Sequence, residues 1–185
     1  TFDLIGNDAE WLRVECGILS LGAVADGLGK ELKGYMGELF PFLVQASGHG
    51  RPLVRSIAIW AMSQHSRWVC WTAQAAERGG PAAFFQPALQ TMLERMKDHN
   101  KSVQEAAVSA LSKLIQTAEE LIESFIGHII PVLVHCHTFF QERNMYLLYD
   151  AISTLAESAG EALERPEYLA ALLPPLLSRW EALGD

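Results

Sequence analysis

Two short segments of the chain contain residue types that could bind a metal ion or a phosphate. The run His135-Cys136-His137 carries imidazole and thiol groups, which are ligands of zinc. On an α-helix, residues two positions apart point about 200° away from each other, so the two imidazoles cannot face one ion. The run Gly22–Lys30 has the glycines of a phosphate-binding loop, but its lysine is misplaced and no serine or threonine follows it. We therefore expect no bound metal and no cofactor.

Residue patterns of known catalytic sites are also missing. The sequence has no Gly-x-Ser-x-Gly motif, and Cys70 has no base at a spacing that would activate its thiol. The carboxylate pair Glu119-Glu120 suits a solvated helix start, where the helix dipole favours negative charge. We therefore expect a protein that is not an enzyme.

The composition favours an acidic, folded protein that binds other proteins. The chain has 185 residues, 50% of them hydrophobic, and its 22 acidic residues outnumber 14 Lys and Arg to give a net charge of −8. This balance argues against direct nucleic-acid binding and suits a partner rich in Lys and Arg. No apolar run approaches the ~20 residues that cross a bilayer, so we expect no membrane insertion. Three widely spaced cysteines imply no disulfide framework and favour the cytosol or nucleus.

An internal repeat indicates how the chain is built. Large apolar residues recur at intervals of 41, 49 and 44 residues, and a second column follows three residues later, as on one face of a helix. Prolines recur with nearly the same period inside apolar helical patterns. The two columns are Ile18, Ile59, Val108, Ile152 and Leu21, Met62, Leu111, Leu155; the prolines are Pro41, Pro87, Pro131 and Pro174-Pro175.

The period predicts an all-α fold, an α-solenoid of HEAT repeats. We expect about three full helix pairs and one unpaired helix at each end, within a single segment, 1–185, of a longer solenoid. A four-helix bundle is the alternative, but a bundle has no reason to repeat its prolines. The predicted helices are 9–28, 33–47, 51–73, 81–98, 101–118, 120–139, 142–160 and 166–183, and the repeat units are 1–28 (partial), 33–73, 81–118, 120–160 and 166–185 (partial).

The second helix of each pair leaves a stripe of residues that the core does not use. The stripe is apolar in the first two helices and becomes polar to acidic in the fourth. Trp60 lies in it and could anchor a partner, although a tryptophan that caps the core is the alternative; Trp68 and Trp71 are expected in the core. The stripe residues are Cys16, Leu19, Ala23, Asp26; Ile57, Trp60, Gln64, Arg67; Ala106, Ser109, Lys113, Gln116; and Asp150, Ser153, Glu157, with Thr154 alongside.

Several segments resemble the transportins, the receptors of the importin-β (karyopherin-β) superfamily that carry proteins with proline-tyrosine nuclear localisation signals. The resemblance runs in order through nearly the whole chain. It rests on the segments that begin at Trp11, Leu53, Asn100, Leu148 and Pro166, among them Leu53-Val-Arg-Ser-Ile-Ala-Ile-Trp60 and Asn100-Lys-Ser-Val-Gln-Glu-Ala-Ala107.

The resemblance implies a cargo-signal site. A pocket for the Pro-Tyr end of the signal would be lined by Leu19, Ala23, Ile57 and Trp60. An upstream Arg of the signal would meet Asp150 and Thr154, with Lys113 and Gln116 as neighbours. The sequence departs from the family pattern at three positions: Gln64 replaces a common Arg, Gln116 a carboxylate, and Lys113 a small polar residue.

The resemblance also implies partners and a location. The full-length receptor would bind Ran-GTP and nucleoporins, mostly outside this segment, and would shuttle between cytoplasm and nucleus. Two other interpretations of the function stay open. The segment could belong to a HEAT scaffold of another assembly, such as a phosphatase subunit or a condensin-like arm. It could also come from an importin-β relative with a different cargo code.

Overall fold

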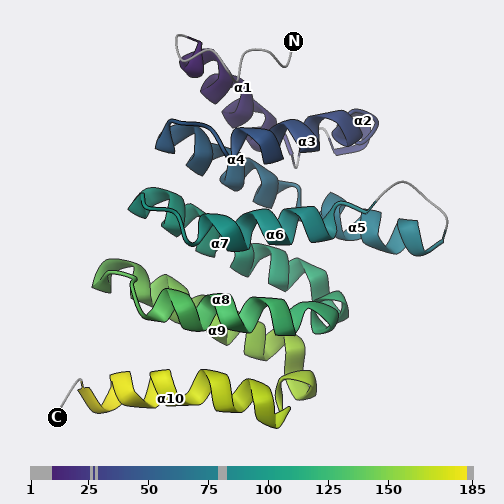
Figure 1. The fold of residues 1–185 in the computed structure, drawn as a ribbon. Coiled ribbons are helices and arrows are strands. Elements are labelled where there is room, and N and C mark those ends of the chain that lie inside the picture. The colour runs from purple at the N-terminus through teal and green to yellow at the C-terminus, as the bar shows by residue number, and fades with distance from the viewer. Residues whose placement is uncertain (1–9, 26, 28, 79–82, 183–185) are drawn as a thin grey trace.

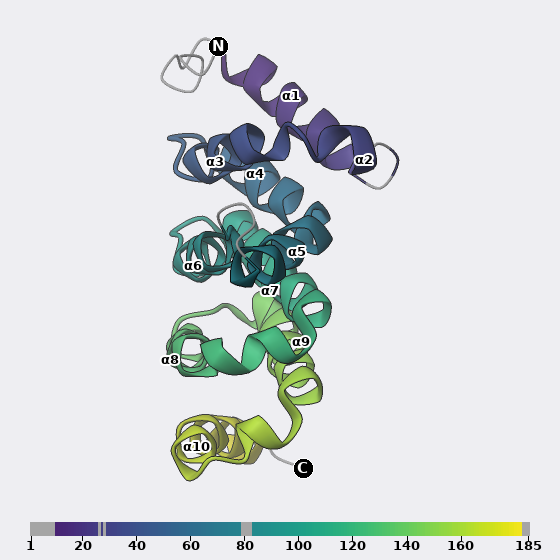
Figure 2. The ribbon, with the colours of Figure 1, turned by 90° about the vertical axis from the view of Figure 1, so that its right-hand side faces the viewer.

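Stacked helices make up the fold. The computed structural model describes residues 10–25, 27, 29–78 and 83–182, and all regular secondary structure in these ranges is helical. Successive helices run back and forth and stack from the N-terminus to the C-terminus (Figure 1). Seen from the side, they form two layers, with α3, α6, α8 and α10 along one edge (Figure 2). The main contacts of each layer helix are with its neighbours in the stack. The expected all-α HEAT solenoid is confirmed, and a closed four-helix bundle is excluded.

The two layers are made of helices that alternate along the chain. The first layer consists of α3 (Met36–Ala46), α6 (Phe85–Arg95), α8 (Ile126–His137) and α10 (Pro166–Ala182). The second layer consists of α1 (Trp11–Ala23), α4 (Pro52–Gln64), α7 (Lys101–Ala118) and α9 (Glu142–Ala159). The short helix α2 (Gly29–Leu32), the longer helix α5 (Ser66–Glu77) and two 3₁₀ helices, η2 (Glu119–Phe125) and η3 (Gly160–Leu163), lie in the connections.

The predicted apolar columns form the core. Ile18, Ile59 and Val108 of the first column are at most 1% exposed, whereas Ile152 is half buried. In the second column, Leu21 alone is half buried. The repeated prolines lie inside α3, α8 and α10 as expected. Pro87 is the third residue of α6, where a missing N–H breaks no helical hydrogen bond.

Several predicted helices are wrong in their extent. The helix expected over 51–73 breaks at His65, whose φ of −95° and ψ of 15° are not helical. Two serine hydroxyls form hydrogen bonds around this break. Ser63 donates to the carbonyl of Trp60, and Ser66 donates to the carbonyl of Ser63. The segment expected as 33–47 begins only at Met36, and the first turns of 120–139 are a 3₁₀ helix. The expected helix 9–28 ends at Ala23, and the residues around the predicted starts at 9 and 81 lie outside the described ranges.

A buried ion pair joins two adjacent repeats. Nε and Nη2 of Arg55 each donate to one carboxylate oxygen of Asp98 at 2.8 Å, and both side chains are about 5% exposed or less. The remaining Arg55 nitrogen, Nη1, donates to the carbonyls of His49 and Gly50 at 2.9 and 3.0 Å. Because the two ends of this network lie in the α3–α4 and α6–α7 turns, it fixes how α4 sits on α7.

The network continues to the next repeat through amides. The main-chain N–H of Asn100 donates to Asp98, and the Asn100 side chain caps α7. The buried side chain of Gln104 donates to the carbonyl of Asp98 at 2.6 Å. Asn144 of α9 donates to the carbonyl of Lys101 at 3.3 Å. These bonds hold the amino-terminal ends of α4, α7 and α9 in line.

Removal of the Asp98 charge should destabilise the fold. We predict that Asp98→Asn lowers the free energy of unfolding by about 3–5 kcal/mol near neutral pH, since it leaves the buried Arg55 without a counter-ion. Burial alone would raise the pKa of the Asp98 carboxyl, but hydrogen bonds from Arg55 and Asn100 outweigh this effect and hold the pKa below its ordinary value. The contribution is therefore present above the ordinary aspartate pKa and is lost as the pH falls through the folded-state value.

Urea unfolding at a series of acidic pH values measures both effects. The exposed Asp150 provides the control, and Asp150→Asn should change stability by no more than about 0.5 kcal/mol. A wild-type loss of stability on acidification that persists unchanged in Asp98→Asn would contradict the assignment.

A strained residue gives a second prediction. Glu119 and Gly160 follow α7 and α9 at equivalent points, with φ of 49° and 48° and ψ of −131° and −129°. Glycine adopts this conformation freely, whereas a glutamate is strained in it. Glu119→Gly should therefore raise the unfolding free energy by about 1 kcal/mol, and Gly160→Ala should lower it by at least as much. Glu120→Gly is the control in a urea titration and should not stabilise. Destabilisation by Glu119→Gly would refute the strain.

Candidate functional site

One layer presents a continuous surface to the candidate site. Helix α1 packs on α4, α4 on α7, and α7 on α9, so their outward stripes lie side by side in chain order. Figure 2 shows α7 and α9 following one another along this side of the stack. The surface therefore leads from the predicted apolar stripe of α1 to the predicted acidic stripe of α9.

A groove is hollowed into this surface between α4, α7 and α9. It encloses about 490 Å³ and is lined by Trp60 and Gln64 of α4, Ser109 and Lys113 of α7, and Tyr146 and Leu147 of α9, together with small residues and Glu105. We call it the α4–α7–α9 groove. Its walls combine two aromatic rings with polar groups, a lining that suits an extended peptide better than a small molecule.

Trp60 has two environments. Its side chain is half buried and packs against the core, and it also lines the groove. The six-membered ring lies directly on Gly22 of α1, because a Cβ atom at position 22 would be 2.3 Å from Cζ3 of Trp60. Glycine at this position therefore allows the ring to approach α1 closely. Trp60 is both a packing residue between α1 and α4 and part of the exposed wall.

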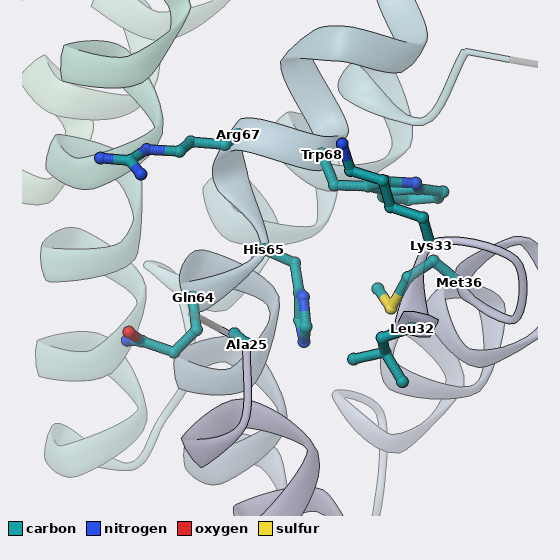
Figure 3. Close-up of a pocket in the computed structure, with 8 residues that line it drawn as sticks. All are labelled: Ala25, Leu32, Lys33, Met36, Gln64, His65, Arg67 and Trp68. Carbon is teal, nitrogen blue, oxygen red and sulfur yellow. The ribbon is translucent and has the colours of Figure 1, made fainter. Parts of the chain in front are cut away.

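A hydrogen bond connects the two sides of the groove. The Lys113 ammonium donates to Oε1 of Gln64 at 2.8 Å, which joins α7 to α4. Figure 3 shows the Gln64 side chain extending from α4 away from Leu32 and Met36. The amide nitrogen of Gln64 lies 3.4 Å from the hydroxyl oxygen of Ser63. Two of the three departures from the family pattern, Gln64 and Lys113, therefore contact each other.

A smaller hollow lies beside the break between α4 and α5. It encloses about 200 Å³ and is bounded by Leu32, Met36 and Trp68, with the His65 ring between α4 and this cluster (Figure 3). Arg67 extends away from the cluster, in the same direction as Gln64. The sequence prediction placed Arg67 on the helix of Trp60, but the break at His65 puts it on α5 instead.

Apart from Trp60, the predicted residues at the apolar end are not among those that line the groove. Leu19 is 45% exposed on α1, and Ala23 lies one turn further along the same helix and is exposed. Ile57 is half buried on α4, one turn before Trp60. Gly22, which touches Trp60, lies between Leu19 and Ala23 in the sequence of α1, so these two residues are on the helix that packs against the Trp60 ring. Asp26 of the same stripe lies outside the described residues.

At the polar end the structure separates the predicted residues. Asp150 is exposed on α9, one turn after Tyr146, and Gln116 is exposed on α7, one turn after Lys113. Thr154 is 5% exposed, so the expectation that it lines the surface is wrong. It follows the buried Ala151 by three residues and precedes the buried Leu155, a spacing that turns its side chain to the core.

Trp71 is a second correction. We expected it in the core together with Trp68, which is buried, but Trp71 is 47% exposed. The ammonium of Lys33 lies 5.8 Å from the centroid of its ring. The break at His65 changes the orientation of α5, so residues after it do not continue the pattern of α4.

Several groove residues lie outside the predicted stripe, among them Tyr146, Leu147 and Glu105. Tyr146 is 64% exposed and precedes Asp150 by four residues, so the acidic stripe extended by one turn would have included it. Leu147 and Glu105 lie beside the stripe positions of α9 and α7. Glu105 forms an ion pair with Arg143 of α9 at 2.8 Å.

Two residues of the run His135-Cys136-His137 pack against neighbouring residues. Cys136 is buried, its Sγ atom faces the carbonyl of Met96, and burial raises the pKa of its thiol to about 12. His137 lies against Tyr149, with Nε2 and the hydroxyl oxygen 3.5 Å apart. Among the residues that the structure describes, no three His, Cys, Asp or Glu side chains are grouped so as to hold a metal. No described helix is both long enough and apolar enough to span a membrane.

Comparisons with known proteins relate the chain to one family. A HEAT-like repeat family model matches residues 11–64. Human and mouse Transportin-1 are each 39% identical over 95% of the chain, and the Dictyostelium discoideum Transportin is 39% identical over the same share. The Importin subunit beta-2 of Schizosaccharomyces pombe is 33% identical over 95%. The chain spans 18–19% of the length of these relatives. It is a HEAT-repeat segment homologous to the transportins and the importin subunits beta-2.

Proposed function

We propose that the chain is part of a nuclear import receptor and binds proline-tyrosine nuclear localisation signals across α1, α4, α7 and α9. The observation that carries this proposal is the position of Trp60, which lies on Gly22 of α1 and also lines the α4–α7–α9 groove. One aromatic ring thereby connects an apolar surface on one side with a polar groove on the other. The homology to transportins and importin subunits supports the same function.

The apolar end suits the Pro-Tyr end of a signal. Proline and tyrosine rings pack well on aromatic and aliphatic surfaces, and Trp60, Leu19, Ala23 and Ile57 offer such a surface on adjacent helices. Leu19 is accessible without rearrangement, since its side chain is already exposed. Central aromatic residues of this kind commonly contribute most of the affinity of an interface.

The polar end suits the upstream Arg of a signal. Asp150 offers a carboxylate with which a guanidinium can form two hydrogen bonds, and Gln116 on the adjacent helix offers an amide oxygen. The net charge of −8 attracts a basic peptide over longer distances. The buried Thr154 takes part through the packing of α9, not through contact with the signal.

The other partners belong to the proposal for the whole receptor. Ran-GTP and nucleoporins would bind mostly outside this segment, and the receptor would shuttle between cytoplasm and nucleus. Two further functions would give different binding. A HEAT scaffold of another assembly would bind no extended basic peptide, and an importin-β relative with another cargo code would bind equally after replacement of Pro-Tyr by Ala-Ala.

Trp60→Ala tests the apolar end. We predict that it weakens binding of a fluorescent basic peptide ending in Pro-Tyr by about 2 kcal/mol or more, because it removes a central aromatic contact. Fluorescence anisotropy measures the affinity, and a parallel melting curve identifies the temperature range in which the variant is folded. Trp180→Ala removes an 80% exposed indole from α10 and should leave the affinity unchanged. Undiminished binding by folded Trp60→Ala would exclude Trp60 as the anchor.

Asp150 and Gln116 test the polar end. Asp150→Ala should weaken binding by about 1.5–3 kcal/mol and flatten the dependence of affinity on salt, because it removes a charge-assisted hydrogen bond. Gln116→Glu should tighten binding of a peptide that carries the upstream Arg. It should not tighten binding of the same peptide with Ala in place of Arg. Equal tightening of both peptides would mean that the added charge acts through the general field of the protein and not through a specific Arg site.

A further inference from the structure

Lys113 places a positive charge inside a groove proposed to receive a basic signal. Its side chain is half buried, and its ammonium donates to the neutral amide oxygen of Gln64 at 2.8 Å. Among the described residues, no carboxylate oxygen lies within 4.0 Å of this ammonium. The groove's own acid, Glu105, pairs instead with Arg143 at 2.8 Å. An ammonium has three donors, so Lys113 retains the capacity to bind an anion.

We infer that Lys113 and Gln64 form a subsite for an acidic side chain of the cargo signal, located between its upstream Arg and its Pro-Tyr end. This inference rests on the proposed function. The order of the helices supports the placement, because α7 lies between α4, which carries Trp60, and α9, which carries Asp150. A peptide that spans both ends of the surface passes over Lys113.

The chemistry of the subsite favours a carboxylate over an amide or a cation. The ammonium of Lys113 and the amide NH₂ of Gln64 supply two donors on the two sides of the groove, and a carboxylate oxygen accepts from both. The hydroxyl of Ser63, next to the Gln64 amide, is itself engaged with the carbonyl of Trp60. The Gln64 amide nitrogen donates to this hydroxyl at 3.4 Å and has a second N–H with which to bind a ligand.

The aromatic walls of the groove increase the need of the Lys113 ammonium for a counter-ion when a peptide binds. Trp60, Tyr146 and Leu147 line the same groove, and a bound peptide removes water from the space between them. A lysine that loses water without gaining a counter-ion is destabilised, whereas one that gains a carboxylate is not. A cargo Lys or Arg at this point is repelled. The groove therefore selects signals by an acidic residue as well as by their basic residue.

Paired peptides test the subsite. Each peptide carries the upstream Arg and the Pro-Tyr end, and one Glu is placed in turn at every position between them, with Gln and Lys peptides as its partners. With the wild-type chain, one position should show binding of Glu about tenfold tighter than Gln, and Lys weaker than both. In Lys113→Met, which keeps an unbranched apolar stem, Glu and Gln should bind within about twofold of each other. Lys97→Met, at an exposed position on the α6–α7 turn, is the control and should keep the tenfold preference.

The outcomes separate this inference from the proposed function. Equal affinity for Glu and Gln peptides at every position, with binding that still requires Pro-Tyr, overturns the subsite and leaves the proposed function standing. A Glu preference that depends on Lys113, in peptides that bind equally well without Pro-Tyr, supports the subsite and overturns the Pro-Tyr specificity. A Glu preference that survives in Lys113→Met also overturns the subsite, because another cation must then provide it. Absence of binding by all peptides overturns both.

Discussion

The ion pair between Arg55 and Asp98 is the contact on which the candidate site depends. It is almost fully buried and doubly hydrogen-bonded, and it joins the start of α4 to the turn before α7. Repeats in a solenoid touch only their neighbours, so the position of one repeat on the next is set by few contacts. Trp60 and Gln64 lie on α4 and Lys113 lies on α7. The distance between the Gln64 amide and the Lys113 ammonium therefore follows from this pair and from the apolar columns beneath it.

The helix break at His65 and the lack of a side chain at Gly22 determine the shape of the surface that the α4–α7 packing supports. Residue His65 ends α4, so that α5 leaves the direction of the stripe and carries Arg67 and Trp71 elsewhere. Gly22 lets the Trp60 ring lie against α1. Together they leave Trp60 near the end of α4, between the exposed apolar residues of α1 and the polar groove. Glycine at position 22 thus matters for the site although it carries no functional group.

The two repeated columns of large apolar residues were sufficient to predict the fold, because the core positions of a solenoid recur in the sequence once per repeat. Ile59, Met62 and Leu111 are buried as their spacing predicted. The break at His65 and the 3₁₀ helix η2 could not be predicted from the same pattern, since both lie in segments with many polar residues and depend on local hydrogen bonds. In the site, Trp60 and Gln64 of the predicted stripe line the α4–α7–α9 groove, and their role in binding a signal stays a prediction. Thr154 does not line the surface, because one residue of rotation on α9 separates the exposed Ser153 from the buried Thr154.

A structure of the chain bound to a peptide with an upstream Arg and a Pro-Tyr end would show directly where the signal binds. We predict that the peptide lies extended across α1, α4, α7 and α9. Its Pro-Tyr end should pack on Trp60 at the α1 side, and its Arg should meet Asp150. A peptide bound instead to the opposite layer, along α3, α6, α8 and α10, would contradict the account. So would a peptide in the groove with its Pro-Tyr end at Asp150.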